Sequence, residues 1–394
     1  MIIEKYVISG GAGIHDGSSE ANAYSFLEML SGIASGQFNV LGQPTGHRYN
    51  IKKGIGFTGG WTISGSGSFY GPLILRGYNN TPGDGYLGRD SQWKLIETNM
   101  PFLDCKGQAL GYSNPAAART ILESLSISGI SSDFTLVNMT PGENVITRCV
   151  IKQGGGSNGS VGAFGGGGVA SNSILYNNDI YHFGQGFGPD GENNAATVVL
   201  NGQAEKLIGN RIQSFGGYAC ILINTDSAFV ANNLIIGNSG YAVKQNGNAN
   251  GTILLNNTFV GHRHIFKGFG DIRRPITFIN NIMADSSGFA FAFNGNLTAP
   301  QGEQTSGIMF IANNRFRNNP SGTADYYPDW YSGTNYDNIS GNGNWQVDYV
   351  DAPNQDFRLI SSSPAVSAGH PTAISMGVFQ RNQSGQEISS ISVG

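Results

Sequence analysis

The sequence is short of charged side chains. Asp, Glu, Lys and Arg make up 12% of its 394 residues, about half the ~25% usual in soluble domains. Such a chain contains few of the Lys and Glu residues that favour long helices. Glycine, by contrast, occurs 59 times, about twice its usual share. Aromatic residues reach 11%, which argues against a disordered chain. The composition favours short strands joined by tight turns.

Clusters of positive charge and long apolar runs are also missing. The net charge is -4 and the pI is about 5.9, so there is no basic field for nucleic acid or anionic lipid. No run approaches the ~18 apolar residues that span a membrane. The first residues have neither the basic region nor the apolar stretch of a secretory signal. We expect synthesis in a cytoplasm, no nucleic-acid partner and no membrane insertion.

Cysteine is scarce and odd in number, with Cys105, Cys149 and Cys220 far apart in the chain. Because no C-x-x-C motif occurs, neither a disulfide framework nor a zinc site is indicated. Cys149 and Cys220 stand in apolar runs, where a free thiol behaves as a small buried hydrophobe. We expect no cofactor.

A short motif recurs along the chain, in which an apolar strand is followed by a polar step that usually contains Asn. The last Asn of each step gives six markers: Asn178, Asn210, Asn233, Asn257, Asn281 and Asn314. Successive markers lie 32, 23, 24, 24 and 33 residues apart. Upstream, Ser124 and Arg148 stand at a similar place. A coil of three short strands and three turns needs about 22–25 residues, so this spacing predicts a parallel β-helix.

Asparagine suits the corner of such a coil, because it tolerates the left-handed backbone of a sharp bend. Equivalent residues of stacked coils lie about 4.8 Å apart, so their amides can form a hydrogen-bonded ladder inside the stack. A β-sandwich has no fixed period of this length, and a propeller blade needs ~40–50 residues. Parallel crossovers are right-handed almost always. The predicted fold is therefore an all-β, right-handed parallel β-helix.

The longer gaps contain turn-rich segments, which predict loops at residues 154–168, 184–194 and 289–307. Near the N-terminus, Ser18 or Ser19 is suited to cap a short helix. Its apolar face would contain residues at i, i+3, i+4 and i+7: Ala23, Phe26, Leu27 and Leu30. This helix is well placed to cover the first coil.

We divide the chain into three parts. Residues 1–60 hold the N-terminal strand, the capping helix and the first coils. Residues 61–380 form the β-helix with its loop insertions. Residues 381–394 are a polar C-terminal tail.

The two ends resemble the N-terminal cap and the closing coil of pectate-lyase-like β-helix proteins. The matching residues are Asp16–Ala23, Asp356–Leu359, Ser363-Pro364-Ala365, Ala368-Gly369 and Met376–Phe379. Proteins of this kind occur among bacterial surface adhesins and phage virion proteins, where homotrimers are common. The resemblance is specific for the fold. Together with the lack of a signal peptide, the sparse charge and the lack of a clear catalytic group, it leads us to expect a location in a virion, as a head decoration or a tail spike or fibre component. It says little about activity, because one fold hosts many functions.

Enzymes on this fold attack polysaccharides, either with Asp-bound calcium and a basic residue or with two or three carboxylates. The best local group of candidate catalytic residues is Asp179, His182, Asp190 and Glu192. Asp190-Gly191 is equally a turn signal. A second group, Asp271, Arg273 and Arg274, is better explained as a turn with an ion pair.

His262 and His264 are two residues apart, so on a strand they would share one face. No third potential ligand lies at a spacing typical of a metal-binding motif, so we expect no metal site. Five aromatic residues gather further on: Tyr326, Tyr327, Trp330, Tyr331 and Tyr336. They are candidates to stack on sugar rings, or else to pack as a lid or against another subunit.

Three functions follow. The first is a phage virion structural protein, a homotrimer in contact with other virion proteins and with host surface polysaccharide as a candidate ligand. The second is a polysaccharide lyase or glycoside hydrolase. The third is a non-catalytic carbohydrate-binding adhesin.

Overall fold

The computed structural model describes most of the chain between its second residue and residue 366. The described residues are 2–34, 46–54, 56–58, 61–64, 72–105, 110–113, 120–130, 137–139, 143–154, 162–164, 172–183, 196–202, 204–215, 219–237, 240–246, 251–269, 276–288, 290–294, 309–318, 339–341 and 348–366. None of the helices in these segments has the length and apolar character needed to cross a bilayer.

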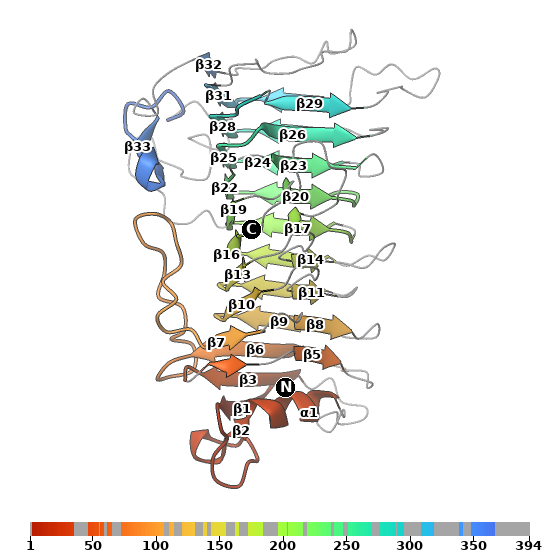
Figure 1. Cartoon of the computed structure of the whole chain (residues 1–394), viewed down its shortest axis with the longest axis vertical. Helices are drawn as coiled ribbons and strands as arrows, with labels where there is room; N and C mark the ends of the chain where they lie inside the picture. The colour runs from red at the N-terminus through yellow and green to blue at the C-terminus, as the bar shows by residue number, and fades with distance from the viewer. Residues whose placement is uncertain are drawn as a thin grey trace, which may run out of the picture.

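The described strands stack into three long parallel sheets, which form a tall column of coils (Figure 1). Sheet A contains, in spatial order, β2 (Tyr24–Ser25), β1 (Ile2–Ile8), β3 (Gly46–Lys52), β6 (Leu73–Tyr78), β9 (Thr120–Glu123), β12 (Val145–Thr147), β15 (Ile174–Tyr176), β18 (Lys206–Ile208), β21 (Phe229–Ala231), β24 (Ile253–Leu255), β27 (Ile276–Ile279) and β30 (Met309–Ala312).

Sheets B and C complete each coil. Sheet B contains β4 (Phe57–Thr58), β7 (Phe102–Asp104), β10 (Ser126–Ile130), β13 (Val150–Gly154), β16 (Asp179–His182), β19 (Arg211–Ser214), β22 (Leu234–Ile236), β25 (Thr258–Val260), β28 (Ile282–Ala284), β31 (Arg315–Arg317) and β32 (Ile339–Gly341). Sheet C contains β5 (Trp61–Ser64), β8 (Leu110–Ser113), β11 (Val137–Met139), β14 (Gly162–Phe164), β17 (Ala196–Leu200), β20 (Ala219–Ile223), β23 (Tyr241–Gln245), β26 (His264–Phe269) and β29 (Phe291–Asn294).

Within these three sheets neighbouring strands pair in parallel, as β18 does with β15 and β21. Alternate residues of each strand point into the column, so one coil contributes Leu207, Ile212 and Ile221 to a continuous apolar core. The predicted fold class, a right-handed parallel β-helix with a short N-terminal capping helix, is confirmed.

The predicted asparagine ladder is also confirmed. From Asn178 to Asn314, the side-chain Nδ2–H of each ladder Asn donates to the side-chain Oδ1 of the next, at 2.9–3.0 Å. The residue just before each ladder position has a positive φ, for example +55° at Asn232 and +54° at Asn256. Each corner therefore uses one residue for the bend and the next for the ladder.

Upstream, the markers Ser124 and Arg148 are one residue early. They have φ values of +55° and +56°, so they make the bend, whereas the buried Leu125 and Cys149 occupy the ladder position. The ladder ends at this level, where the backbone N–H of Cys149 donates to Asn178 Oδ1 at 2.9 Å.

The capping helix α1 (Phe26–Ala34) begins later than predicted. Its N-cap is Ser25 rather than Ser18 or Ser19, because Ser25 and Glu28 form a reciprocal capping box. Phe26 is buried as predicted, but Leu27 is exposed. The helix instead packs its buried side chains at i, i+3 and i+7 onto the first coil: Phe26, Met29 and Ile33.

Two of the predicted loops contain strands. β14 lies within residues 154–168 and β29 within residues 289–307, and both belong to sheet C. The first part of the predicted closing coil, Asp356–Leu359, is not in a coil: β33 (Tyr349–Asp351) and β34 (Asp356–Leu359) form an antiparallel hairpin around η3 (Ala352–Asn354). The later motifs, Ala368-Gly369 and Met376–Phe379, lie outside the described residues. The predicted tail, 381–394, lies outside the described residues.

Two segments lie on the outer face of sheet B (Figure 1). Residues 79–101, here the cover loop, join β6 to β7 and pack Leu95 and Met100 against Val150. Residues 348–366, here the C-terminal hairpin, cover an outward apolar strip further along the sheet. That contact includes Leu234, Ile236, Val260 and Ile282 of the sheet, with Tyr349, Phe357 and Leu359 of the hairpin.

Candidate functional site

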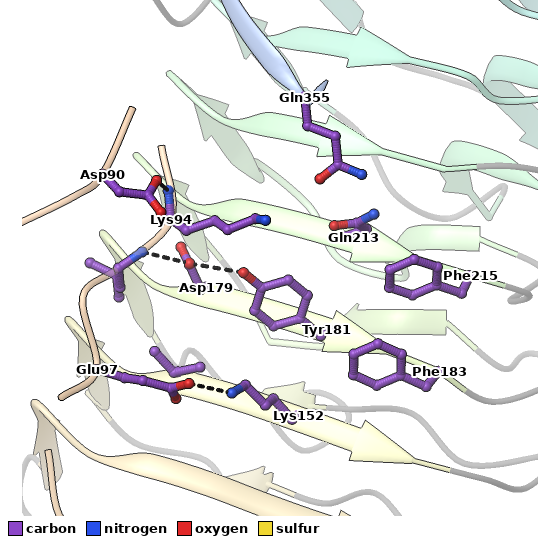
Figure 2. Close-up of a pocket in the computed structure, with 12 residues that line it drawn as sticks. Asp90, Lys94, Glu97, Lys152, Asp179, Tyr181, Phe183, Gln213, Phe215 and Gln355 are labelled. Atoms are coloured by element: carbon purple, nitrogen blue, oxygen red, sulfur yellow. Dashed lines mark hydrogen bonds and ion pairs between the residues drawn. The ribbon is translucent and has the colours of Figure 1, made fainter. Parts of the chain in front are cut away.

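A cleft of about 390 Å³ opens on sheet B, lined by the cover loop, by β13, β16 and β19, and by one residue of the C-terminal hairpin. Figure 2 shows its lining. The lining residues are Asp90, Lys94, Leu95, Glu97, Val150, Lys152, Asp179, Tyr181, Phe183, Gln213, Phe215 and Gln355. The floor therefore comes from regular strands, and the walls come from segments distant in sequence.

Three aromatic rings form a row along one side of the cleft (Figure 2). The rings of Tyr181 and Phe183 are 6.1 Å apart and 11° from parallel. Those of Phe183 and Phe215 are 4.9 Å apart and 10° from parallel. Phe183 is 48% exposed and Phe215 is 43% exposed. The outer faces and edges of such a stack are apolar and partly exposed, and they can pack against a flat ligand, including the C–H face of a sugar ring.

Polar groups line the other side of the cleft. Lys152 Nζ contacts Glu97 Oε1 at 2.6 Å, and Ser126 Oγ donates to Glu97 Oε2 at 3.1 Å. Asp90 accepts two backbone N–H bonds at 2.9 Å within its own turn. The cleft thus combines an aromatic row with charged and amide side chains, the usual pattern of a site for a polar organic ligand.

Asp179 holds the cover loop to the β-helix. Its carboxylate contacts Arg89 at 2.5 Å, accepts the N–H of Leu95 at 2.7 Å and accepts the hydroxyl of Tyr181 at 3.1 Å. Burial and the neighbouring Asp179 charge raise the pKa of Tyr181, so its hydroxyl stays a donor. Other N–H groups of Arg89 donate to Trp93 O, Asn177 Oδ1, Asn178 O and Gly209 O.

The C-terminal hairpin is held by buried arginines. Arg211 donates to Gln355 Oε1 at 2.5 Å, where Gln355 reaches the cleft. Arg315 and Arg317 lie 3.4 and 3.6 Å from Asp348 Oδ2, and Ser363 Oγ donates to Asp348 Oδ1 at 2.9 Å. Both walls of the cleft are therefore attached by charged contacts to the sheet.

The structure separates two of the candidate catalytic residues. Asp179 lies on the outward side of β16 beside the cover loop, whereas His182 shares the inward side with Ile180, a core residue. His182 is buried, which lowers its pKa and favours the neutral ring. Asp190 and Glu192 lie outside the described residues, so the group of four remains a prediction.

The remaining candidates are placed as follows. The aromatic cluster Tyr326, Tyr327, Trp330, Tyr331 and Tyr336 lies outside the described residues, as do Asp271, Arg273 and Arg274. The His262 ring faces the carbonyl oxygen of Ile235 at 3.2 Å, whereas His264 stacks on Tyr241 at 5.6 Å. Across the described part of the chain, no three His, Cys, Asp or Glu side chains are grouped for a metal ion.

We predict that His262 makes the fold acid-sensitive. Burial lowers its pKa to about 4, so the unfolded state binds a proton more readily between about pH 6.5 and pH 4. The contribution of the neutral His262 ring to the free energy of unfolding is fully present above this window. About 3 kcal/mol of it is lost as the pH falls through the window.

The unfolding free energies of wild type and His262→Gln, measured by denaturant at several pH values, test this effect. The pH dependence that the carboxylates contribute is common to both proteins, so it cancels in the difference between their unfolding free energies. Wild type should lose more stability than the variant on acidification, and parallel pH profiles would contradict the prediction.

The three cysteines are free and buried. Desolvation raises the pKa of each thiol to about 12, so none is poised as a thiolate nucleophile.

The aromatic row was missed from the sequence, although a signal exists. Phe183 and Phe215 each stand five residues after a ladder asparagine, at Asn178 and Asn210. Equal offsets in adjacent coils place two side chains at the same height of the repeat, so they stack. The cover loop had no comparable signal, because its contacts with sheet B are long-range.

No protein-family model and no curated protein matches the chain. Among solved structures, it is similar to the pectate lyase Pel9A, with 14% identity, 96% of each chain covered and a TM-score of 0.49. It is also similar to a mannuronic-acid-specific family 6 polysaccharide lyase from human gut microbiota, with 12% identity, 91% of each chain covered and a TM-score of 0.42. Similarity at this level carries no argument about activity.

Proposed function

We propose that this protein is a virion surface β-helix that binds polysaccharide in the cleft on sheet B, without cleaving it. One observation carries the proposal: the parallel, half-exposed rings of Phe183 and Phe215 continue the row begun by Tyr181. The exposed edges and outer faces of these rings offer an apolar surface to the sugars of an extended chain, while the facing polar groups can bind hydroxyl groups.

Binding is favoured over catalysis because the described carboxylates of the cleft are already engaged. Glu97 is paired with Lys152, and Asp179 with Arg89. Asp90 accepts backbone N–H groups of its own turn. A glycosidase needs one carboxyl group free to carry a proton and a second free to attack or to activate water. A polysaccharide depolymerase is the alternative, with Asp190 and Glu192 as its untested candidates.

Loss of either phenylalanine ring should weaken polysaccharide binding. Phe183→Ala and Phe215→Ala should each raise the dissociation constant about tenfold, which corresponds to about 1.4 kcal/mol. Titration calorimetry with purified capsular and cell-wall polysaccharides measures this effect. Phe102→Ala is the matched control, because Phe102 is 42% exposed on the same sheet but outside the cleft.

Three outcomes would contradict the proposal. Wild type that binds none of the polysaccharides has no such function, and variants that bind as tightly as wild type place the site elsewhere. A fall in polysaccharide chain length during incubation would favour the depolymerase.

The virion location and a homotrimeric state remain part of the proposal, motivated by the terminal motifs. Mass spectrometry of purified particles, together with terminase, portal or capsid genes beside this gene, would support the location. Sedimentation analysis gives the number of chains, and a strict monomer would contradict the trimer.

A further inference from the structure

The outer face of sheet A is apolar over much of its length. From β12 to β27 its outward residues are Val145, Thr147, Ile174, Tyr176, Lys206, Ile208, Phe229, Ala231, Ile253, Leu255, Thr277 and Ile279. We call these twelve side chains the apolar face. Lys206 is its one charged member, and the aliphatic stem of a lysine can itself lie along apolar surface.

Most of the apolar face is at least partly exposed, although the small Ala231 is buried. Tyr176 is 46% exposed and Ile253 is 39% exposed. On sheet B, the cover loop and the C-terminal hairpin bury the outward apolar residues. On sheet C, outward residues such as Val199 and Leu222 are also buried. Sheet A therefore presents a long apolar surface that no other described segment covers.

The same sheet is polar toward the N-terminus. There, outward charged side chains are paired within the subunit, as Glu4 is with Arg48 and Arg76 is with Glu123. The change from paired charges to aliphatic residues marks one end of the apolar face. A contiguous apolar surface larger than a few hundred Å² on a folded protein is a sign of an interaction site.

We propose that the apolar face binds a second copy of this chain. A copy carries the same row of side chains at the same spacing of about 4.8 Å, so the two rows can interdigitate over their whole length. The face is a stack of short strands, three or four residues each, with few polar groups to orient a small ligand. Such a face is suited to packing against another sheet.

The size of the apolar face is sufficient for such an interface. Its six strands, about 4.8 Å apart, form a strip about 29 Å long. With flanks, a strip about 20 Å wide would bury roughly 600 Å² on each copy, or about 1,200 Å² in total, the lower limit for specific stable interfaces. Each copy would then remove its apolar face from water by contact with a neighbouring copy.

Cysteine protection tests the interface directly, because the three native thiols are buried and unreactive. Ile253→Cys introduces a thiol in the apolar face, and Val350→Cys introduces one on β33 at similar exposure, 43% at Val350. In the assembled protein, a maleimide should label the first at least about tenfold more slowly than the second. Dilution to the monomer should restore equal rates.

A charge on the face should prevent association. Ile253→Asp and Tyr176→Asp should each raise the dissociation constant of the oligomer at least about 100-fold, whereas Val350→Asp should not. Sedimentation velocity measures this, and circular dichroism checks the fold of each variant. Wild type that stays monomeric at about 50 µM, or equal labelling of both thiols in an oligomer, would overturn the inference.

The test separates this inference from the proposed function. The cleft lies on sheet B, so monomeric Ile253→Asp should still bind polysaccharide if the proposed function holds. An oligomer of two chains that dissociates on Ile253→Asp would refute the trimer and support the apolar face.

Discussion

Replacing Asn257 with alanine should lower the free energy of unfolding by about 4 kcal/mol. Asn257 Oδ1 accepts from both the backbone N–H and the side-chain amide of Asn233, each at 3.0 Å. Its own amide donates to Val230 O at 2.8 Å and to Asn281 Oδ1 at 3.0 Å. Alanine would leave two buried donors of Asn233 without acceptors, and each unsatisfied buried group costs about 1–3 kcal/mol.

The adjacent Asn256 is the matched control for this effect. It has a φ of +54° and makes the bend, and its substitution by alanine should cost only the strain of that backbone, about 1–2 kcal/mol. Urea denaturation of the two variants gives both values. Equal losses would mean that the ladder adds nothing beyond the shape of its corners.

Most of the fold was predictable from the sequence because it is built by repetition. Each coil has to bend at the same place and bury a side chain at the same place, so Asn210 and Asn233 recur at the spacing of one coil. The prediction slipped by one residue where the ladder stops, at Ser124 and Arg148. Asn suits both the residue that makes the bend and the residue that forms the ladder. In a coil that has a bend but no ladder, the sequence does not show which of the two positions the polar residue occupies.

The cleft was less predictable because its walls do not repeat. The cover loop is attached through Arg89 and Asp179, which are 90 residues apart, and through Lys152 and Glu97, which are 55 apart. No local pattern of residues reveals such pairs. Likewise, the closing motif around Asp356 gave no sign that the chain would turn back along sheet B as a hairpin.

Loss of the Asp179 carboxylate should detach the cover loop and remove the cleft. Asp179 and Arg89 are both buried, at 1% and 9% side-chain exposure. Asp179→Ala would leave a buried guanidinium without its counter-charge, at a cost of about 3–5 kcal/mol, and undocking of the cover loop relieves that cost. Polysaccharide binding and the resistance of residues 79–101 to proteolysis should therefore fall together.

Arg89 distinguishes this structural role of Asp179 from a catalytic one. Arg89→Met removes the other member of the pair and should give the same loss of binding and of protease resistance as Asp179→Ala. The double variant, Arg89→Met with Asp179→Leu, should recover part of the stability, because no buried charge is left unpaired. A catalytic Asp179 would give a different result: Asp179→Ala would abolish cleavage of a polysaccharide while the cover loop stayed protected, and no variant of Arg89 that kept the loop docked would reproduce it.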